Sequence, residues 1–203
     1  MANITLTNTI AAKKSAGLHL VLDFDGVIVD KPNGKGKLLI MAEKIKALFE
    51  GALASGHCIS ICTNNHSSEV KKSFKALNLN QENFNKIFII GEKRPHGKNE
   101  HILWANEHHG IDKKISPVVL FDDNTENGLF AAKEGYIPVI PIHKIGSGMF
   151  SKSVYDTSHF DTFKEILNRP MEVKEIAENR AKAKGYYNTV FSCLKNINGR
   201  NIA

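Results

Sequence analysis

The sequence predicts an α/β fold, a three-layer Rossmann-like domain in which helices cover both faces of a parallel sheet. Two observations lead to this prediction. Short apolar runs alternate along the chain with amphipathic stretches of ten or more residues, which is typical of repeated β-α-β units. The runs are apolar almost throughout instead of at every second position, so they are expected to be strands that are covered on both faces.

Five runs are predicted to be strands, and four stretches between them are predicted to be helices. The strands are expected at His19–Phe24, Cys58–Cys62, Lys86–Ile90, Val118–Phe121 and Tyr136–Ile140. The helices are expected at Leu38–Ser55, Ser67–Leu77, Lys98–His109 and Thr125–Glu134. Three of these helices precede a glycine, at position 56, 110 or 135, where a left-handed C-terminal cap favours that residue.

The chain is predicted to divide into three segments. Residues 1–16 are expected to form a flexible arm, and residues 17–169 are expected to form the α/β domain, with a short helix at Phe160–Asn168. Residues 170–203 are expected to form a basic helical tail that includes a candidate helix at Val173–Leu194. This tail either docks on the domain or begins a further region.

Composition narrows the class of protein. The 203 residues are 42% hydrophobic and 24% charged, which is the balance of a soluble globular protein. The apolar runs are too short to cross a bilayer, and the first residues lack a Sec-type signal. The chain is therefore expected to be soluble in a cytoplasmic or other reducing compartment, while export to another cell stays open. The net charge of +6 fits an acidic partner or scattered surface lysines, and it does not decide between them.

The cysteines exclude one class of phosphatase. A cysteine-dependent phosphatase needs an arginine six positions after its cysteine, so that the loop between them can surround a phosphate. The residues six positions after the three cysteines are Asn64, Ser68 and Gly199. The cysteines also form neither an even disulfide set nor a zinc-ligand pattern, which favours small core residues in a reducing compartment.

Two acidic clusters follow predicted strands. Asp23-Phe24-Asp25-Gly26-Val27 follows the first strand, and Asp122-Asp123-Asn124 follows the fourth. Either cluster alone is explained by a turn or a helix cap. Because parallel strands end at the same edge of a sheet, the two clusters together would bring three or four carboxylates into one crevice. Their mutual repulsion then calls for a cation, and oxygen ligands of this kind suit Mg²⁺.

Two further strand ends belong to the same edge. Thr63-Asn64-Asn65 follows the second strand and offers a hydroxyl and two amides. Lys98 stands at the first turn of the helix after the third strand, where its charge and the helix amides would attract an anion. Lys93 and Arg94 are rivals of Lys98 for this role.

These segments resemble the four motifs of the haloacid dehalogenase-like (HAD) superfamily, and they occur in the same order. The resemblance spans residues 18–142 and includes LFDDNTENGLFAAKEGYIPV, which is similar to the family's fourth motif. It implies a magnesium-dependent phosphatase. The acid two positions after the first aspartate argues against a dehalogenase, which has no use for it.

The resemblance assigns roles to the acidic residues. Asp23 would attack phosphorus and form an aspartyl-phosphate, and Asp25 would protonate the leaving oxygen and then deprotonate water. Mg²⁺ would be held by the carboxylate of Asp23, the main-chain oxygen of Asp25 and the side chain of Asp123. Asp122 would contact the ion through a water molecule, or contact the ligands without binding the ion itself.

The resemblance also assigns the contacts to substrate. Thr63 and Lys98 would bind phosphoryl oxygens and stabilise charge in the transition state. Two further positions are expected to bind substrate, Asn64 and Gly26.

The spacing of the motifs indicates an enzyme without a large cap domain. Only about a dozen residues separate Asp25 from the next helix, and one helix and one strand are expected between Thr63 and Lys98. An open crevice favours a phosphorylated macromolecule, and some capless relatives resemble magnesium-dependent protein tyrosine phosphatases. A phosphoprotein is therefore the expected partner. The loop Lys31–Lys37 would overhang the cleft and select acidic peptides, or else be a solvated turn.

Two alternative functions stay open at this point. The first is a phosphatase for nucleic acid 3′ ends, which the basic charge allows, although no basic stripe interleaved with aromatic residues is present. The second is a binding module for phosphorylated ligands that has kept the fold without turnover. The complete set of motif residues argues against the second.

Overall fold

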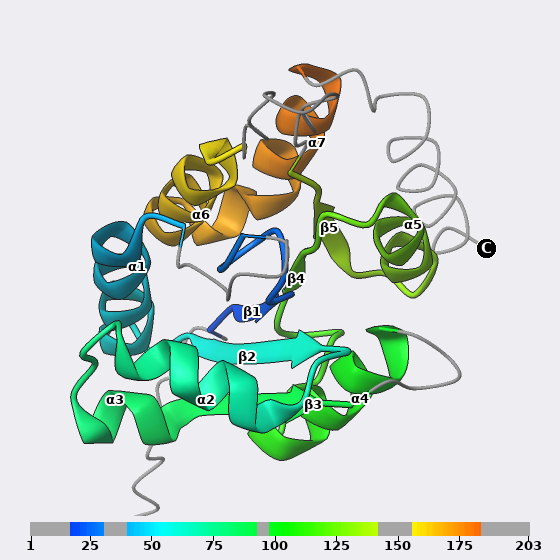
Figure 1. Ribbon diagram of the computed structural model, residues 1–203. Coiled ribbons are helices and arrows are strands. Elements are labelled where there is room, and N and C mark those ends of the chain that lie inside the picture. Colours follow the sequence, from blue (N-terminus) through cyan, green and yellow to red (C-terminus); the bar gives the residue numbers. More distant parts are fainter. Residues whose placement is uncertain (1–16, 31–39, 93–97, 142–155, 184–203) are drawn as a thin grey trace, which may run out of the picture.

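The computed structural model describes residues 17–30, 40–92, 98–141 and 156–183. These residues form a five-stranded parallel sheet with the strand order β3-β2-β1-β4-β5 (Figure 1). The strands are β1 His19–Leu22, β2 Cys58–Thr63, β3 Ile87–Gly91, β4 Val118–Phe121 and β5 Ile137–Val139. The predicted parallel α/β sheet is confirmed.

Helices cover both faces of this sheet. They are α1 Ala42–Ala54, α2 Ser67–Lys75, α3 Gln81–Lys86, α4 Lys98–His109, α5 Thr125–Lys133, α6 Ser158–Asn168 and α7 Val173–Ala183. A single 3-10 turn at Pro170–Glu172 joins α6 to α7. Figure 1 shows α1, α6 and α7 on one side of the sheet and α4 and α5 on the other, so the three-layer prediction is confirmed.

The strands are buried on both faces, as their unbroken apolar character predicts. In β1, Leu20 and Leu22 belong to the larger core, which includes α1, α6 and α7, whereas Val21 belongs to the smaller core against α4 and α5. In β4, Phe121 likewise belongs to the larger core and Leu120 to the smaller one. Neighbouring residues of one strand therefore stabilise opposite layers of the domain.

The predicted helix ends are also confirmed at the glycines. Gly56, Gly110 and Gly135 have φ values of 78°, 63° and 83°, in the left-handed region. Each follows the end of its helix, α1, α4 and α5 respectively, by one or two residues. A residue with a Cβ would be strained in this conformation, which explains why glycine occupies all three places.

One helix was not predicted. The short helix α3 lies just before β3, and the side chain of its N-cap Asn80 accepts a hydrogen bond from the Asn83 amide at 2.7 Å. Its sequence, QENFNK, has one apolar residue and hence no helical periodicity. None of its side chains is fully buried, so the helix depends on its N-cap more than on an apolar face packed into the core.

The helices after the sheet are packed on the domain. Phe160 and Phe163 of α6 and Val173 and Ile176 of α7 all belong to the larger core. The expected division at residue 170 stays a prediction. Several predicted segments lie outside the described residues: the arm 1–16, the loop Lys31–Lys37, the rivals Lys93 and Arg94, and the tail after Ala183.

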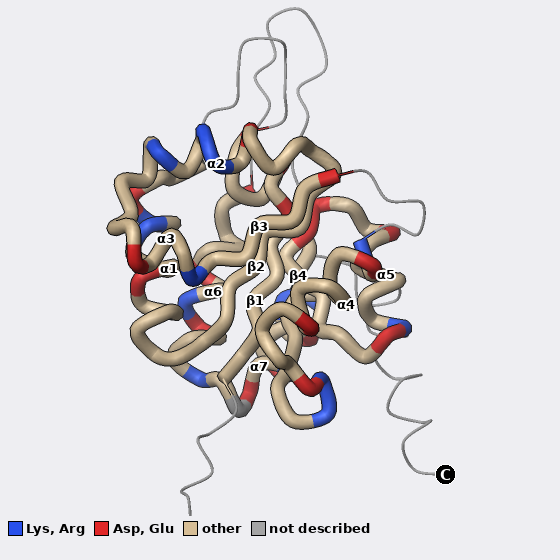
Figure 2. Tube along the Cα trace, turned by 90° about the horizontal axis from the view of Figure 1, so that it is seen from below, with Lys and Arg blue, Asp and Glu red and all other residues tan. Residues whose placement is uncertain are grey.

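The charged residues of the described segments are dispersed. In Figure 2 the lysines and arginines are spread over several helices, among them α2 and α5. No helix in the described part of the chain is long and apolar enough to cross a membrane.

The topology of the sheet fixes the place of the site. From β1 the chain proceeds through β2 to the edge strand β3, and it then returns to β4 on the other side of β1. The neighbouring strands β1 and β4 therefore send their connections in opposite directions. In open α/β sheets a crevice forms at the carboxyl ends of two such strands, and ligands bind there.

Candidate active site

Asp23 and Asp122 lie side by side at this switch point. Leu22 pairs with Phe121 at the ends of β1 and β4, so that the next residue of each strand is an aspartate. The Asp23 amide donates to the Phe121 carbonyl at 2.8 Å, which keeps the two strand ends together. The two acidic clusters therefore meet at one edge of the sheet, as the sequence predicts.

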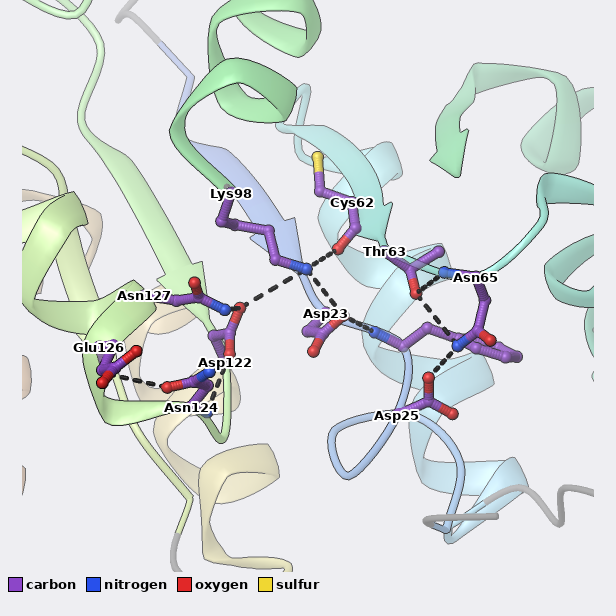
Figure 3. A network of polar contacts seen from close by, with 11 residues as sticks. Asp23, Asp25, Cys62, Thr63, Asn65, Lys98, Asp122, Asn124, Glu126 and Asn127 are labelled. Atoms are coloured by element: carbon purple, nitrogen blue, oxygen red, sulfur yellow. Dashed lines mark hydrogen bonds and ion pairs between the residues drawn. The ribbon is translucent and has the colours of Figure 1, made fainter. Parts of the chain in front are cut away.

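Lys98 connects these carboxylates. It is the first residue of α4 and is 3% exposed. Its Nζ lies 2.9 Å from Asp23 Oδ1 and 3.6 Å from Asp122 Oδ2, and it donates to the Cys62 carbonyl at 2.5 Å. Figure 3 shows the ammonium group in the middle of these three oxygen atoms. A buried cation with these contacts is held in one position, and its charge is directed at the crevice.

Burial sets the charge state of the site. It raises the pKa of Asp122 to about 7, helped by the neighbouring charge of Asp23 and opposed by Lys98. Burial also raises the pKa of Asp23, while Lys98 and the Phe24 amide, which donates to Asp23 Oδ1 at 2.7 Å, oppose the change. The pKa of Lys98 is raised, because the attraction of Asp23 and Asp122 outweighs the effect of its burial. The ammonium group therefore stays charged, whereas burial disfavours the ionised forms of Asp23 and Asp122 unless a further cation offsets their charge.

Asp123 completes an acidic cluster with the geometry of a cation site. Oxygen atoms of Asp23, Asp122 and Asp123 all lie within 4.8 Å of one another. Asp23 and Asp123 are partly exposed, whereas Asp122 is buried behind them. Among the described residues three carboxylates lie near one lysine here, so a divalent cation would balance the charge, and hard oxygen ligands suit such an ion.

Asp25 stands in a tight turn after β1. The amides of Ile28 and Val29 both donate to the Phe24 carbonyl at 3.0 Å, and Gly26 has a φ of 76°. The side chains of Phe24, Val27, Ile28 and Val29 are fully buried, which anchors the turn on the core. His159 Nε2, on α6, lies 2.9 Å from the Val27 carbonyl oxygen, and this hydrogen bond further stabilises the turn. This turn holds Asp25 and the predicted substrate-binding Gly26 next to the crevice.

The end of β2 provides the third side of the site. Thr63 is fully buried, and its Oγ1 accepts a hydrogen bond from the Asn65 amide at 3.1 Å. The Asn65 side chain donates to Asp25 Oδ2. Asn64, which the sequence predicts as the substrate contact, is exposed. Its role stays a prediction, and it is Asn65 that the structure brings to the acidic cluster (Figure 3).

Cys62 lies at the back of the site and is inert. Its side chain is fully buried at the end of β2, and burial raises the pKa of its thiol to about 12. A thiol in this state does not act as a nucleophile at neutral pH. At Cys62, the exclusion of cysteine chemistry thus has a physical basis in addition to the missing arginine.

Comparisons with known proteins agree with this fold. No model of a protein family matches the chain, and no protein with a curated description matches it in sequence. Solved structures do match. One is the N-terminal part of a Bacteroides fragilis protein containing a phosphatase domain, complexed with Mg, at 16% identity and a TM-score of 0.51. The match covers 76% of this chain but only 40% of the Bacteroides chain.

A second structure covers most of both chains. It comes from Mesorhizobium loti and is described as a HAD-like phosphatase, with 10% identity, a TM-score of 0.50, and 79% of this chain and 88% of that chain aligned. The chain therefore has the HAD-like fold. At these identities the likeness concerns the fold, and the predicted resemblance to the HAD superfamily is confirmed at this level.

A third structure matches at a lower TM-score of 0.46. It is 3-deoxy-D-manno-octulosonate 8-phosphate phosphatase from Moraxella catarrhalis in complex with magnesium, phosphate and its sugar, at 17% identity over 88% of this chain and 94% of that one. Neither of the first two descriptions mentions a protein substrate. The finer resemblance to protein tyrosine phosphatases therefore gains no support from them.

Within this HAD-like fold, the structure adds two residues besides Asn65 that the sequence analysis did not single out as site residues. Asn127, on the first turns of α5, donates to Asp122 Oδ2 at 3.0 Å. Asn124 caps the same helix by accepting from the Glu126 amide at 2.9 Å, and its own amide donates to Asp122 Oδ1 at 2.9 Å. Asn127 is the third residue after the N-cap Asn124, so it lies in the first turn of α5, next to the end of β4 that carries Asp122.

Proposed function

We propose that the chain is a magnesium-dependent phosphomonoester hydrolase that uses Asp23 as its nucleophile. The observation that carries the proposal is the convergence on Asp23. Lys98 lies 2.9 Å away, the carboxylates of Asp122 and Asp123 are within 4.8 Å, and the turn that bears Asp25 follows directly. A fixed cation, a candidate metal site and a second acid around one carboxylate are the parts that displacement at phosphorus requires.

The reaction would proceed in two displacements. In the first, a carboxylate oxygen of Asp23 forms a bond to phosphorus while the bond to the leaving oxygen breaks, and Asp25 gives that oxygen its proton. In the second, a water molecule attacks the aspartyl-phosphate, Asp25 takes a proton from the water, and Asp23 is released as a carboxylate. Lys98 and Thr63 would hold the phosphoryl oxygens through both steps.

Magnesium is the cation that fits the proposal. The carboxylates of Asp23 and Asp123 would bind it directly, with Asp122 behind them, and Asn127 holds Asp122 in place. When bound, the ion polarises the phosphoryl group and screens its charge from the carboxylates. This matters because burial raises the pKa of Asp23, whereas the nucleophile must be ionised to react.

A protein substrate with phosphotyrosine is the finer part of the proposal. It rests on the short spacing of the motifs and on the described segments between them. Between Thr63 and Lys98, the described residues form only α2, α3 and β3, and they contain no cap domain. An open site offers little grip to a small phosphoester, whereas a phosphotyrosine ring adds apolar contact area and carries the phosphate away from the peptide backbone.

A substrate panel tests the proposal. Purified protein with Mg²⁺ would be given phosphotyrosine and phosphoserine peptides, sugar phosphates, nucleotides and 3′-phosphorylated DNA. Release of phosphate that requires Mg²⁺ and Asp23 supports the hydrolase, and its absence from the whole panel contradicts it. A higher kcat/KM for phosphotyrosine peptides supports the finer proposal. A preference for the 3′-phosphate would replace it with a nucleic acid end phosphatase.

A further inference from the structure

The amide of Asn65 lies between two parts of the site that come from different strands. Its Nδ2 donates to Asp25 Oδ2, in the turn after β1, and lies 3.4 Å from Thr63 Oγ1, at the end of β2. A side-chain amide has two N–H hydrogens, so one can point to each partner. Figure 3 shows the Asn65 side chain bent back toward both of them.

Chemistry fixes which end of the amide faces the acid. An ionised carboxylate only accepts hydrogen bonds, so the Asn65 oxygen would be repelled by Asp25, whereas the NH₂ group is attracted. Donation to one carboxylate oxygen restricts rotation of the side chain. The contact therefore limits Asp25 to a small range of orientations next to the nucleophile.

Thr63 serves as the anchor of this amide. Its Oγ1 accepts from the main-chain amide of Asn65 at 3.1 Å as well as from the side chain. A hydroxyl has two acceptor positions and one donor hydrogen. With both acceptor positions used by Asn65, the Thr63 hydrogen is left to donate in another direction.

The loop that carries Asn65 is held tightly against β3. A Cβ on Gly91 would lie 2.3 Å from the Asn65 carbonyl oxygen and 2.7 Å from the Ser67 amide nitrogen. The Glu92 amide also donates to the Thr63 carbonyl at 3.2 Å. Only glycine allows this approach, and so the position of Asn65 is set by backbone contacts on two strands.

We propose that Asn65 is a positioning residue that aims Asp25 at the leaving group. It acts through Asp25, and it has no contact of its own with the reacting atoms. This inference rests on the proposed function, because it concerns the proton that Asp25 gives to the leaving oxygen. General acid catalysis contributes typically about 10²- to 10⁴-fold to a rate, and a misaimed acid loses a large part of it.

The test uses leaving groups of different acidity. 4-Nitrophenol leaves as a stable anion and needs little protonation, whereas the alcohol of an alkyl phosphate does not leave without a proton. Wild type, Asn65→Ala and the control Asn85→Ala, an exposed asparagine on α3, are assayed with both esters in Mg²⁺. We expect Asn65→Ala to lower kcat/KM for the alkyl ester by about 10- to 100-fold and kcat/KM for the nitrophenyl ester by less than about 3-fold. The comparison uses kcat/KM because it covers the steps up to the departure of the leaving group and leaves out the hydrolysis of the aspartyl-phosphate, which both esters share.

A second variant guards against a merely structural effect. Asn65→Asp has nearly the same shape but places a like charge next to Asp25, so it should show the same unequal loss with the fold intact, as judged by the melting temperature. Asn85→Ala should leave both rates unchanged. Equal losses of kcat/KM on both esters in Asn65→Ala would overturn the positioning role.

The result also separates this inference from the proposed function. A wild type that hydrolyses both esters, with Asp23→Asn inactive on both, supports the hydrolase whatever Asn65 does. A wild type without activity on either ester overturns the hydrolase and the positioning role together.

Discussion

Lys98 Nζ lies 2.9 Å from Asp23 Oδ1, although the two residues are 75 positions apart in the chain. The contact joins the start of α4 to the end of β1 across the sheet. Both side chains are largely buried, with 2% and 14% of their surface exposed, so water screens the pair only weakly. Lys98 is thereby a structural counterion in the free protein and a candidate ligand for phosphate during turnover.

Lys98→Met should lower both activity and stability. The variant leaves Asp23 and Asp122 without their cation, and removing one partner of a buried pair typically costs about 3–5 kcal/mol. Urea unfolding in EDTA should therefore show a loss of this order, part of which Mg²⁺ restores. The control is Lys86→Met, which breaks the exposed pair with Glu82 and should have no measurable effect. Unchanged stability of Lys98→Met in EDTA would contradict the counterion role.

Asp23→Asn should abolish turnover and keep the fold. The asparagine oxygen can still accept from the Phe24 amide and from Lys98, and the change removes a negative charge from a crowded site. It cannot form the aspartyl-phosphate, so kcat should fall at least about 10³-fold in a phosphate-release assay. Glu165→Gln, on an exposed position of α6, is the matched control. Residual activity of several per cent would rule out the covalent route.

Much of the fold could be predicted because its signals are local. The strands are continuous apolar runs, and the glycines at the helix ends reveal the caps, as Gly56 and Gly135 illustrate. The convergence of Asp23 and Asp122 was also predictable, since it follows from the common direction of parallel strands. The polar helix α3 was not, because Asn80 capping carries no periodic signal.

The contacts inside the site depend on turns, and the sequence predicts these contacts less well than it predicts the strands and helices. Asn64 and Asn65 are adjacent and chemically identical, and only the path of the loop against Gly91 decides which one faces Asp25. Because both residues are asparagine, the sequence does not indicate which of the two side chains faces Asp25. Lys98 is the first residue of α4, and its side chain contacts Asp23, whereas Lys93 and Arg94 lie outside the described residues.

Magnesium should raise the melting temperature of the wild type. A ligand that binds only the folded state stabilises it by about 2.7 kcal/mol at a concentration of 100 times its Kd. Asp123→Ala should lose most of this shift, because its carboxylate is part of the candidate site but is only partly buried. Differential scanning fluorimetry with and without EDTA measures the effect, with Glu165→Ala as control. A shift that is equal in Asp123→Ala would place the ion elsewhere.

Stability should fall at acid pH partly because of His19, which lies on β1 away from the acidic cluster. The ring is fully buried, with Nδ1 2.7 Å from Asn106 Oδ1 and Nε2 2.8 Å from Ser60 Oγ. Because the Asn106 oxygen can only accept, the neutral ring donates from Nδ1 and accepts the Ser60 hydroxyl at Nε2. Burial lowers the pKa of His19 from 6.5 to about 4; the charge of His109 acts in the same direction, and the hydrogen bond with Asn106 opposes the change.

The sign of the His19 effect follows from the two states. Above pH 6.5 the ring is neutral in both the folded and the unfolded chain, and its contribution to stability is complete. As the pH falls toward 4, the unfolded chain binds a proton that the folded chain does not, so the free energy of unfolding decreases by on the order of 3 kcal/mol. Urea unfolding between pH 4.5 and 7.5 should show a steeper loss for wild type than for His19→Gln, which cannot titrate. His108→Gln, at an exposed position of α4, should keep the wild-type slope. Equal slopes for wild type and His19→Gln would mean that other groups cause the acid sensitivity.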